Sequence, residues 1–392
     1  MDPASMTAAL QGVRVLDFSQ QVSGPFASMI LGDLGADVIK VEPPEGEAMR
    51  RTGETFYDGE AVYFLSVNRN KRGIVLDLAQ ESGRATARAL ASQVDIVMEN
   101  FRPGVAERLG IGYDDLKADN PGLIYCSISA FGRTGPDASR PGMDPVVQAM
   151  SGIMQLTGTA ASGPLKTGLP FADVITPMLA TIGMCAALQH RARTGAGQRI
   201  DLAMLDCALF GIAPREQYYF ATGDTPARIG NAHYEIVPYN TYETADGRHL
   251  MLIAHSDKHW QLLARATGNA DLADDPALAV KAGRVAQRAR IDAALARSLA
   301  AQPLAHWNRV LAAGGVMFAP VATFPEVFES ERIGREMVST LERPGAGPFR
   351  VLNNPLHFSA SPTVQRHVPP RLGEHTAEVL AEFGLTPPGA GA

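Results

Sequence analysis

The first third of the chain alternates short β-branched runs with helical patterns, and this alternation limits the possible folds more than any other feature. A strand pattern at 13–18 leads through a turn-rich segment at 19–25 into a helical pattern at 26–34, and a second strand pattern follows at 36–41. Strand, helix and strand within about 30 residues predict a βαβ unit with parallel strands and a right-handed crossover.

The alternation continues, with strand patterns at 73–78, 94–98 and 123–128 separated by helical patterns at 81–92 and 113–118. We therefore predict an α/β fold whose large domain holds an open, mostly parallel, Rossmann-like sheet. Ligands of such sheets bind beyond the carboxyl ends of the strands, so one crevice should lie among the loops 19–25, 99–104 and 129–135. The chain has no G-x-G-x-x-G after its first strand and no G-x-x-x-x-G-K, the fingerprints of dinucleotide and P-loop sites.

The rest of the chain changes character, and 392 residues exceed the roughly 250–300 at which single cores stop growing. Strand patterns on both sides of Asp246-Gly247 predict a hairpin, and helical patterns follow at 259–267, 283–300 and 303–313. We expect a large α/β domain at 6–225, a small α+β domain at 226–325 and a return to the large domain at 326–392. Residues 1–5 precede a second methionine and are expected to be an expression remnant.

Composition excludes several classes of partner. With 46% hydrophobic and 19% charged residues and a net charge of −6, the chain is typical of a soluble globular protein and not of a nucleic-acid or membrane binder. Cys126, Cys185 and Cys207 lack metal-ligand spacing and indicate reduced, buried thiols. No charged-then-apolar leader opens the chain, and apolar runs are interrupted before the ~18 residues of a membrane span. We expect a cytoplasmic protein with no metal site.

The segment Thr167-Gly168-Leu169-Pro170-Phe171-Ala172-Asp173 places a carboxylate at the start of an apolar run that ends at Leu188. A run that is apolar around most of its circumference predicts a helix buried on all sides, beginning near Asp173. Asp173 is then either an N-cap, the commoner role of aspartate at such a position, or an interior carboxylate with a chemical role.

Two other segments carry polar residues that a bare scaffold does not need. The run Glu99-Asn100-Phe101-Arg102-Pro103-Gly104 is either an Asx-turn with a packing aromatic or a place for an adenine or a pantetheine arm. Arg69, Lys71 and Arg72 form either a solvated loop or a cradle for phosphates.

Taken in order, the motifs of this chain resemble those of class III coenzyme A transferases, the CaiB/BaiF family. The resemblance is carried by Gly12–Asp17 with Gly24-Pro25, Leu34–Glu42, Asn70-Lys71-Arg72, the E-N-F-x-P-G run, the G-x-P-x-x-D stretch, Arg193–Gln198, Gly230-Asn231, Pro238-Tyr239 and Leu372-Gly373-Glu374-His375. It implies an interlocked homodimer of ring-like chains, each with a large Rossmann-like domain and a small middle domain, and a site between them.

The resemblance also implies covalent catalysis by Asp173. A carboxylate with a pKa near its ordinary value of about 3.9 is ionised at neutral pH and attacks a thioester without a neighbouring base. Attack on a donor acyl-CoA would give an acyl–aspartyl anhydride, the returning CoA thiolate would give an aspartyl-CoA thioester, and the acceptor acid would reverse these steps. Burial would keep the anhydride from water. Coenzyme A enters as an acyl-CoA substrate, and no permanently bound cofactor is expected.

Carried over position by position, the resemblance implies CoA contacts from Leu76, Asn100, Phe101, Arg108 and Met204, and the phosphate-cradle hypothesis adds Arg72. The chain departs from formyl-CoA transferases at two contact positions. Val22 stands where they have Gln, and Ser129-Ala130-Phe131 where they have Lys-Gly-Tyr. These departures count against oxalate or formate as the substrate pair.

Two alternatives to a transferase remain. The related α-methylacyl-CoA racemases use a His in an R-x-G-H-D run, but this chain has Met143 there, and a thioether cannot exchange a proton. A non-catalytic CoA-binding subunit would not need Asp173. For the substrates, the resemblance suggests succinyl-CoA as donor and a dicarboxylic or other polar short-chain acid as acceptor. Candidates for a distal carboxylate are Arg50, Arg51, His233 and Tyr239, and Asn231 is a further candidate for reaching the site.

Overall fold

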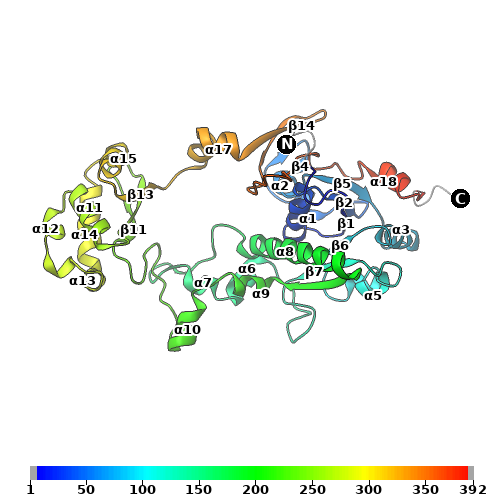
Figure 1. Ribbon diagram of the computed structural model, residues 1–392, viewed down its shortest axis with the longest axis horizontal. Helices are drawn as coiled ribbons and strands as arrows, with labels where there is room; N and C mark the ends of the chain where they lie inside the picture. The colour runs from blue at the N-terminus through cyan, green and yellow to red at the C-terminus, as the bar shows by residue number, and fades with distance from the viewer. Residues whose placement is uncertain (1–6, 387–392) are drawn as a thin grey trace. The chain divides into compact units, whose positions relative to one another are not determined.

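The computed structural model describes residues 7–386 and divides into two units (Figure 1). The first unit holds the chain up to Met154, residues 166–224 and the segment from Arg335 onward, and the second unit holds 155–165 and 225–334. The chain thus leaves the first unit twice and returns to it with its last segment. The expected remnant at 1–5 lies outside the described residues.

The first unit is built on a six-stranded sheet in which every neighbouring pair is parallel. The order is β10-β7-β6-β1-β2-β5, the order of doubly wound nucleotide-binding sheets, with its reversal between β1 and β6. The strands are β1 (Arg14–Asp17), β2 (Asp37–Glu42), β5 (Lys71–Val75), β6 (Ile96–Glu99), β7 (Ile124–Ser129) and β10 (Gln198–Ala203). The predicted parallel α/β sheet is confirmed.

Helices cover both faces of this sheet because successive strand residues point to opposite sides. Val15 packs with α1 (Ser23–Asp33) and α8 (Phe171–Thr194), whereas Leu16 packs with α3 (Glu81–Ala91) and α18 (Thr376–Glu382). The shorter elements of this unit are α2 (Val62–Ser66), α4 (Val105–Arg108), α5 (Tyr113–Leu116), α6 (Asp144–Met150), α9 (Met204–Phe210), α10 (Glu216–Thr222), the 3-10 helix η2 (Ala48–Arg51) and the antiparallel pairs β3 (Phe56–Tyr57) with β4 (Glu60–Ala61) and β14 (Val338–Arg343) with β15 (Gly347–Leu352).

The second unit packs helices on a three-stranded antiparallel sheet with its own apolar core around Trp260. The sheet is β11 (Tyr239–Glu243), β12 (His249–Ile253) and β13 (Met317–Pro320), and the predicted hairpin is β11 with β12. Its helices are α11 (Asp257–Ala266), α12 (Ala270–Ala273), η3 (Pro276–Leu278), α13 (Lys281–Ala286), α14 (Arg288–Leu299), α15 (Leu304–Ala313) and α16 (Phe324–Phe328), with the small pair β8 (Gly158–Thr159) and β9 (Gly163–Pro164). Two short helices, α7 (Ile153–Leu156) and α17 (Glu331–Glu336), lie where the chain passes between units.

Helix α8 departs from the prediction of a helix buried on all sides. Its inner face packs on α1 and the sheet through residues such as Ala180 and Met184, but Met178 and Ile182 are 47% and 64% exposed in the single chain. Among the described residues, α8 is also the one helix long and apolar enough to pass a membrane-span test. Its packed inner face is that of a core helix. The apolar run is nevertheless longer than predicted, because every such run was expected to be interrupted before the ~18 residues of a membrane span.

Candidate active site

A cavity of about 440 Å³ opens at the carboxyl end of the sheet, where the strand order reverses. Such a switch point is where open α/β sheets bind ligands. The walls come from the loops after β1, β6 and β7, from the segment before α6, from the loop before α8 and from the start of α9. The lining includes Gln21, Val22, Ser23, Met49, Tyr63, Asn100, Ser129, Ala130, Met143, Asp144, Lys166, Leu169, Asp173 and Met204.

Asp173 is the third residue of α8, and its side chain is not an N-cap. The N-cap position is Pro170, and the Asp173 carboxylate instead accepts a hydrogen bond from the Ser23 hydroxyl at the start of α1. The first amides of α8 are capped from outside the helix, because Asp144 Oδ1 accepts the backbone N–H of Ala172 at 2.7 Å and that of Asp173 at 3.4 Å. The carboxylate of Asp173 is therefore released from capping and lines the cavity.

Helix α6 fixes the loop that leads into α8. The Gln148 amide donates to Asp144 Oδ2 at 2.7 Å and accepts the backbone N–H of Thr167 at 2.9 Å. Both Asp144 and Gln148 are buried. The start of α8 is thus held by two side chains of one neighbouring helix, which sets the position of Asp173.

The surroundings of Asp173 raise the pKa of its carboxyl group. Burial is the largest cause and the nearby charge of Asp144 adds to it, while the hydrogen bond from Ser23 acts in the opposite direction. The helix N-terminus also favours the ionised form. The carboxylate is therefore more basic than the ordinary aspartate expected from the sequence and, in its ionised form, a better nucleophile.

Asn100 joins the two loops at the switch point. Its side-chain oxygen accepts the backbone N–H of Gln20 at 2.8 Å, and its amide nitrogen donates to the carbonyl of Gln20 at 2.8 Å. An amide that makes both bonds to one distant backbone unit holds the loop after β1 against the loop after β6. The Asx-turn interpretation does not describe these bonds, because they cross between loops.

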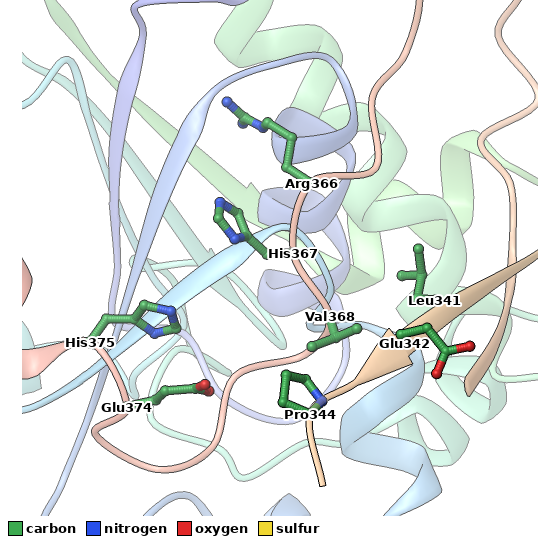
Figure 2. A pocket seen from close by; sticks show the side chains of 8 residues that line it. All are labelled: Leu341, Glu342, Pro344, Arg366, His367, Val368, Glu374 and His375. Carbon is green, nitrogen blue, oxygen red and sulfur yellow. The ribbon is translucent and has the colours of Figure 1, made fainter. Parts of the chain in front are cut away.

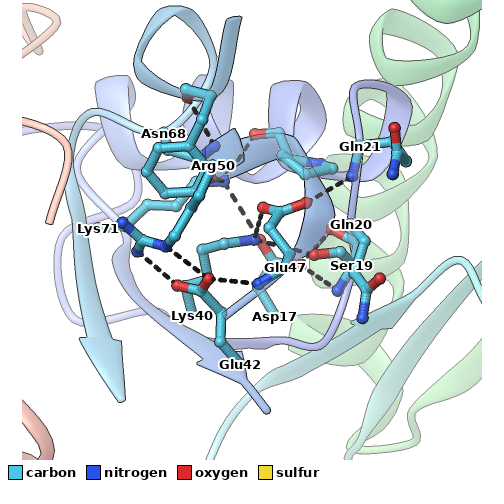
Figure 3. Close-up of polar contacts among 12 residues, drawn as sticks. Asp17, Ser19, Gln20, Gln21, Lys40, Glu42, Glu47, Arg50, Asn68 and Lys71 are labelled. Atoms are coloured by element: carbon cyan, nitrogen blue, oxygen red, sulfur yellow. Dashed lines mark hydrogen bonds and ion pairs between the residues drawn. The ribbon is translucent and has the colours of Figure 1, made fainter. Parts of the chain in front are cut away.

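A buried charge network supports the loop after β1 (Figure 3). Lys40 pairs with Glu47 at 2.8 Å and donates to the carbonyl of Ser19 at 3.0 Å, and both charged side chains are fully buried. Glu47 in turn accepts the backbone N–H of Gln21 at 2.8 Å. Buried charges are tolerated when paired and hydrogen-bonded, and such a network makes the loop that it holds rigid.

Four residues expected from the sequence line this cavity, namely Asp173, Val22, Asn100 and Met204. The other expected contacts lie elsewhere in the first unit. Leu76 is 1% exposed in the core, Phe101 and Phe131 are half-buried against the apolar clusters, and Arg108 is exposed with one bond to the Gly104 carbonyl.

The cations of the Arg69-Asn70-Lys71-Arg72 segment are all buried, so the solvated-loop interpretation is wrong. Arg69 pairs with Asp33, Lys71 with Asp17, and the Arg72 guanidinium is shared by Asp37, Glu378 and Glu382. Arg72 thus ties α18 to the sheet, and its donors are occupied by protein carboxylates.

The candidates for a distal carboxylate also have other partners. Arg50 is buried between Glu42 and Glu60, and Arg51 donates to the Glu45 carbonyl on the surface. In the second unit the rings of His233 and Tyr239 are tilted by 42° with their centroids 5.4 Å apart, and Asn231 donates to Thr241.

The hydroxyl group of Ser23 and the charged side chains of Asp144 and Lys166 line the cavity but were not predicted as site residues from the sequence. Among the described residues that line it, Lys166 is the one cationic side chain, and Asp144 and Asp173 are the two carboxylates. Lys166 is exposed and directly precedes the Thr167–Asp173 segment, and no ion pair joins it within residues 7–386. Its place beside that segment was the only signal in the sequence.

A second cavity, of about 350 Å³, lies between β14 and the segment 366–375 (Figure 2). Its polar groups serve the backbone: His375 accepts the N–H of Gly73 at 3.2 Å, and Glu374 accepts the N–H of Arg371 at 2.8 Å. The cavity that contains the Asp173 carboxylate is therefore the stronger candidate for a reaction site.

Comparison with known proteins gives a consistent result over nearly the whole chain. The sequence model described as CoA-transferase family III matches residues 10–376. The chain is 37% identical to a succinyl-CoA:mesaconate CoA-transferase of Haloarcula hispanica, over 96% of this chain and 97% of that one. It is 37% identical to a succinate–glutarate CoA-transferase of Agrobacterium fabrum, over 95% of each. A crystal structure of a CaiB/BaiF family protein from Brucella suis superposes with a TM-score of 0.88 at 38% identity, covering 96% of this chain and all of that one.

Proposed function

We propose that this chain, which belongs to CoA-transferase family III, moves coenzyme A from succinyl-CoA to a free dicarboxylic or other polar short-chain acid with Asp173 as nucleophile. Members of the family act on CoA thioesters, so the chain is an enzyme whose substrates are an acyl-CoA and a carboxylic acid. The observation that supports Asp173 as the nucleophile is the position of its carboxylate, which does not cap its own helix and lines a cavity at the switch point.

The reaction needs no base beside the nucleophile. An oxygen of ionised Asp173 attacks the thioester carbonyl and expels CoA thiolate, which leaves an acyl–aspartyl anhydride. The thiolate then attacks the aspartyl carbonyl carbon and releases the donor acid, so that coenzyme A is held as an aspartyl thioester. The acceptor carboxylate reverses both steps. The half-buried position of Asp173 limits hydrolysis of the anhydride.

Two observations support a dicarboxylic acceptor. The two curated relatives are named for mesaconate and glutarate, both handled together with succinyl-CoA or succinate. Lys166 adds one unpaired cation at the wall of the cavity that contains Asp173. We propose that its ammonium group pairs with the distal carboxylate of the acceptor while the near carboxylate reacts. For coenzyme A, we propose contacts from Val22, Asn100 and Met204, which line the cavity, and from the exposed guanidinium of Arg108, which lies outside the lining.

We further propose that two copies of the chain associate. Large apolar side chains are exposed on α8, α9 and α10, including Ile182 at 64%, Phe210 at 72% and Phe220 at 69%. Large apolar side chains left exposed in numbers on neighbouring segments of the sequence are typical of an interface with another chain. Light scattering during gel filtration should give twice the mass of one chain, and a monomer at micromolar concentration would contradict this part of the proposal.

The test of function uses mass spectrometry of CoA thioesters. Purified protein is mixed with succinyl-CoA and a panel of free mono- and dicarboxylic acids, beside Asp173→Asn as the isosteric control. We expect a new thioester from at least one dicarboxylic acid with the wild type and none with Asp173→Asn. If no acid is activated while a chiral 2-methylacyl-CoA exchanges its α-hydrogen with deuterated water, the racemase alternative is correct.

A further inference from the structure

The hydroxyl group of Ser23 is held against the carboxylate that the proposed reaction uses. Ser23 is the first residue of α1, its side chain is 3% exposed, and its Oγ donates to Asp173 Oδ1. On its other side Ser23 Oγ lies 3.9 Å from the thioether sulfur of Met204, a weak acceptor. Among the described residues, Ser23 is the hydrogen-bond donor to this carboxylate, and Oδ2 has none.

The backbone around Ser23 leaves the hydroxyl little freedom. The loop before it is held at Gln20 by Asn100. It is held at Gln21 by the buried Glu47 (Figure 3). The next residue is Gly24, where a Cβ would lie 2.2 Å from that of Ser19, so only glycine lets α1 start this close to the loop. A donor fixed by such supports is preorganised and needs no rearrangement during the reaction.

We infer that Ser23 is a positioning residue that keeps Oδ1 of Asp173 as the carbonyl oxygen throughout the cycle and leaves Oδ2 to form and break bonds. This inference rests on the proposed CoA transfer through Asp173. Nothing in the resemblance or in the names of the relatives assigns a role to this serine.

The bonds can be followed through the step that forms the aspartyl thioester. In the anhydride, Oδ2 joins Asp173 Cγ to the acyl carbon, and Oδ1 is a carbonyl oxygen. A lone pair of the CoA thiolate forms the S–Cγ bond, and the C=O electron pair moves to Oδ1, where the Ser23 O–H stabilises the negative charge. When the C=O bond re-forms, the Cγ–Oδ2 bond breaks and Oδ2 leaves with the released carboxylate. No proton is transferred.

The same hydrogen bond acts in the second half of the cycle, because the acceptor carboxylate also attacks Cγ. It selects between the two carbonyl carbons of the anhydride as well. Only attack at Cγ places the developing charge on Oδ1, so the hydroxyl favours the aspartyl thioester over return of the thiolate to the acyl group. Loss of one donor to such an oxyanion costs on the order of 10²-fold in kcat.

The experiment compares Ser23→Ala with Ser28→Ala as the matched control. Both serines lie on α1 and are buried, and both hydroxyls bond an aspartate, but Ser28 contacts Asp17 in the buried network. Steady-state CoA transfer is measured with the best acid of the panel. We expect Ser23→Ala to lower kcat by roughly 100-fold with the KM for succinyl-CoA within about threefold, and Ser28→Ala to keep kcat within about threefold.

A pH profile separates positioning from a merely structural effect. The Ser23 hydrogen bond favours the ionised form of Asp173, so its removal raises the pKa of that carboxyl, and the acidic limb of kcat/KM should move to higher pH in Ser23→Ala alone. Single turnovers with succinyl-CoA are quenched at intervals, and the aspartyl-CoA thioester is followed by the intact mass of the protein. Ser23→Ala should form this thioester more slowly. The rate can be measured even if only part of the variant protein is folded.

Two results would overturn the inference. If the wild type transfers CoA and Ser23→Ala keeps kcat within threefold with an unchanged acidic limb, Ser23 does not position Asp173 while the proposed function stands. If the wild type activates no acid at all, the proposed function and this inference fall together.

Discussion

The side chain of Asn100 makes both of its hydrogen bonds to the backbone of one residue, Gln20, which lies 80 positions earlier in the chain. This relationship closes the switch point of the sheet, because Gln20 follows β1 and Asn100 follows β6, the two strands between which the order reverses. The cavity with Asp173 opens at this junction.

Replacement of Asn100 by aspartate tests that junction with little change in size. The carboxylate still accepts the Gln20 N–H but cannot donate to its carbonyl, so one bond is lost and two acceptors face each other. We expect a loss of about 1–2 kcal/mol in the free energy of unfolding and at least a tenfold fall in kcat/KM. Urea unfolding and steady-state kinetics measure both. Asn120→Asp is the control, because the Asn120 amide donates to the carbonyls of Ala91 and Val94 and not to the loop after β1. An Asn100→Asp protein with normal activity would show that the junction is not needed.

The pH dependence of transfer should report the raised pKa of Asp173. The nucleophile is the ionised carboxylate, so kcat/KM falls as the pH drops through that pKa. Burial raises the pKa, and the acidic limb should therefore lie above the ordinary aspartate value of 3.8. Activity measured from about pH 3 to pH 8 with a carboxylic acid of low pKa checks this, and an acidic limb at or below 3.8 would contradict the structure.

Glu99, at the end of β6, should reduce stability at alkaline pH. It is 2% exposed, and burial raises its pKa from 4.5 to about 7 although the Phe101 N–H bonds to it. Because the folded pKa is the higher one, its contribution to stability is complete below about pH 4.5 and is lost as the pH rises through 7. Glu99→Gln avoids that loss.

We therefore expect Glu99→Gln to be more stable than the wild type at pH 8, by up to roughly 3 kcal/mol, and to lose this advantage near pH 5. Thermal unfolding at the two pH values measures the difference. The exposed Glu54→Gln is the control and should change neither. An advantage that is equal at both pH values would mean that packing, not charge burial, is responsible.

Lys166 should set the preference for a second carboxylate. In Lys166→Ala we expect the KM of a dicarboxylic acceptor to rise roughly three- to tenfold, since a partly exposed ion pair contributes up to about 1 kcal/mol. The KM of a monocarboxylic acceptor should stay within about twofold. Lys117→Ala is the control, because Lys117 is an exposed lysine at the C-terminal end of α5. An equal rise in KM for both classes of acid would mean that Lys166 attracts anions in general and does not bind the second carboxylate.

Arg72 and Arg108 should separate stability from coenzyme A binding. Arg72 is buried among Asp37, Glu378 and Glu382, so Arg72→Ala should cost roughly 3 kcal/mol of unfolding free energy and leave the KM for succinyl-CoA within about twofold. The exposed Arg108→Ala should do the reverse, raising that KM several-fold with little loss of stability. The opposite pattern would support the hypothesis that Arg72 binds the phosphates of coenzyme A.

The sequence predicted the scaffold better than the site. The spacing of apolar residues and the turn residues between them located the bounds of β1, α1, β2, β6 and β7 to within a few residues, because those segments are apolar with regular spacing. It placed the start of β5 at 73, too late, because Lys71 and Arg72 are strand residues whose charges are paired inside the protein. The helical pattern at 283–300 is two helices, α13 and α14, with a break at Gln287.

The site itself depends on contacts between distant segments, which no local pattern encodes. The bond from Ser23 to Asp173 spans 150 positions. The cap that Asp144 gives to α8 comes from a different helix. Asp173 could be selected as the candidate nucleophile only through the resemblance, whereas its release from capping is visible only once α6 is packed against α8.

The two sides of the cavity are held in very different ways. The loop after β1 is tied to buried ion pairs such as Lys40 with Glu47, so a single replacement there leaves an unpaired charge in the interior. The rim carries Met143, which is 68% exposed, and the exposed Lys166, neither of which supports the core. After gene duplication, drift at the rim would cost almost no folding free energy, so a lineage can explore new acids one mutation at a time while the chemistry beneath is inherited unchanged.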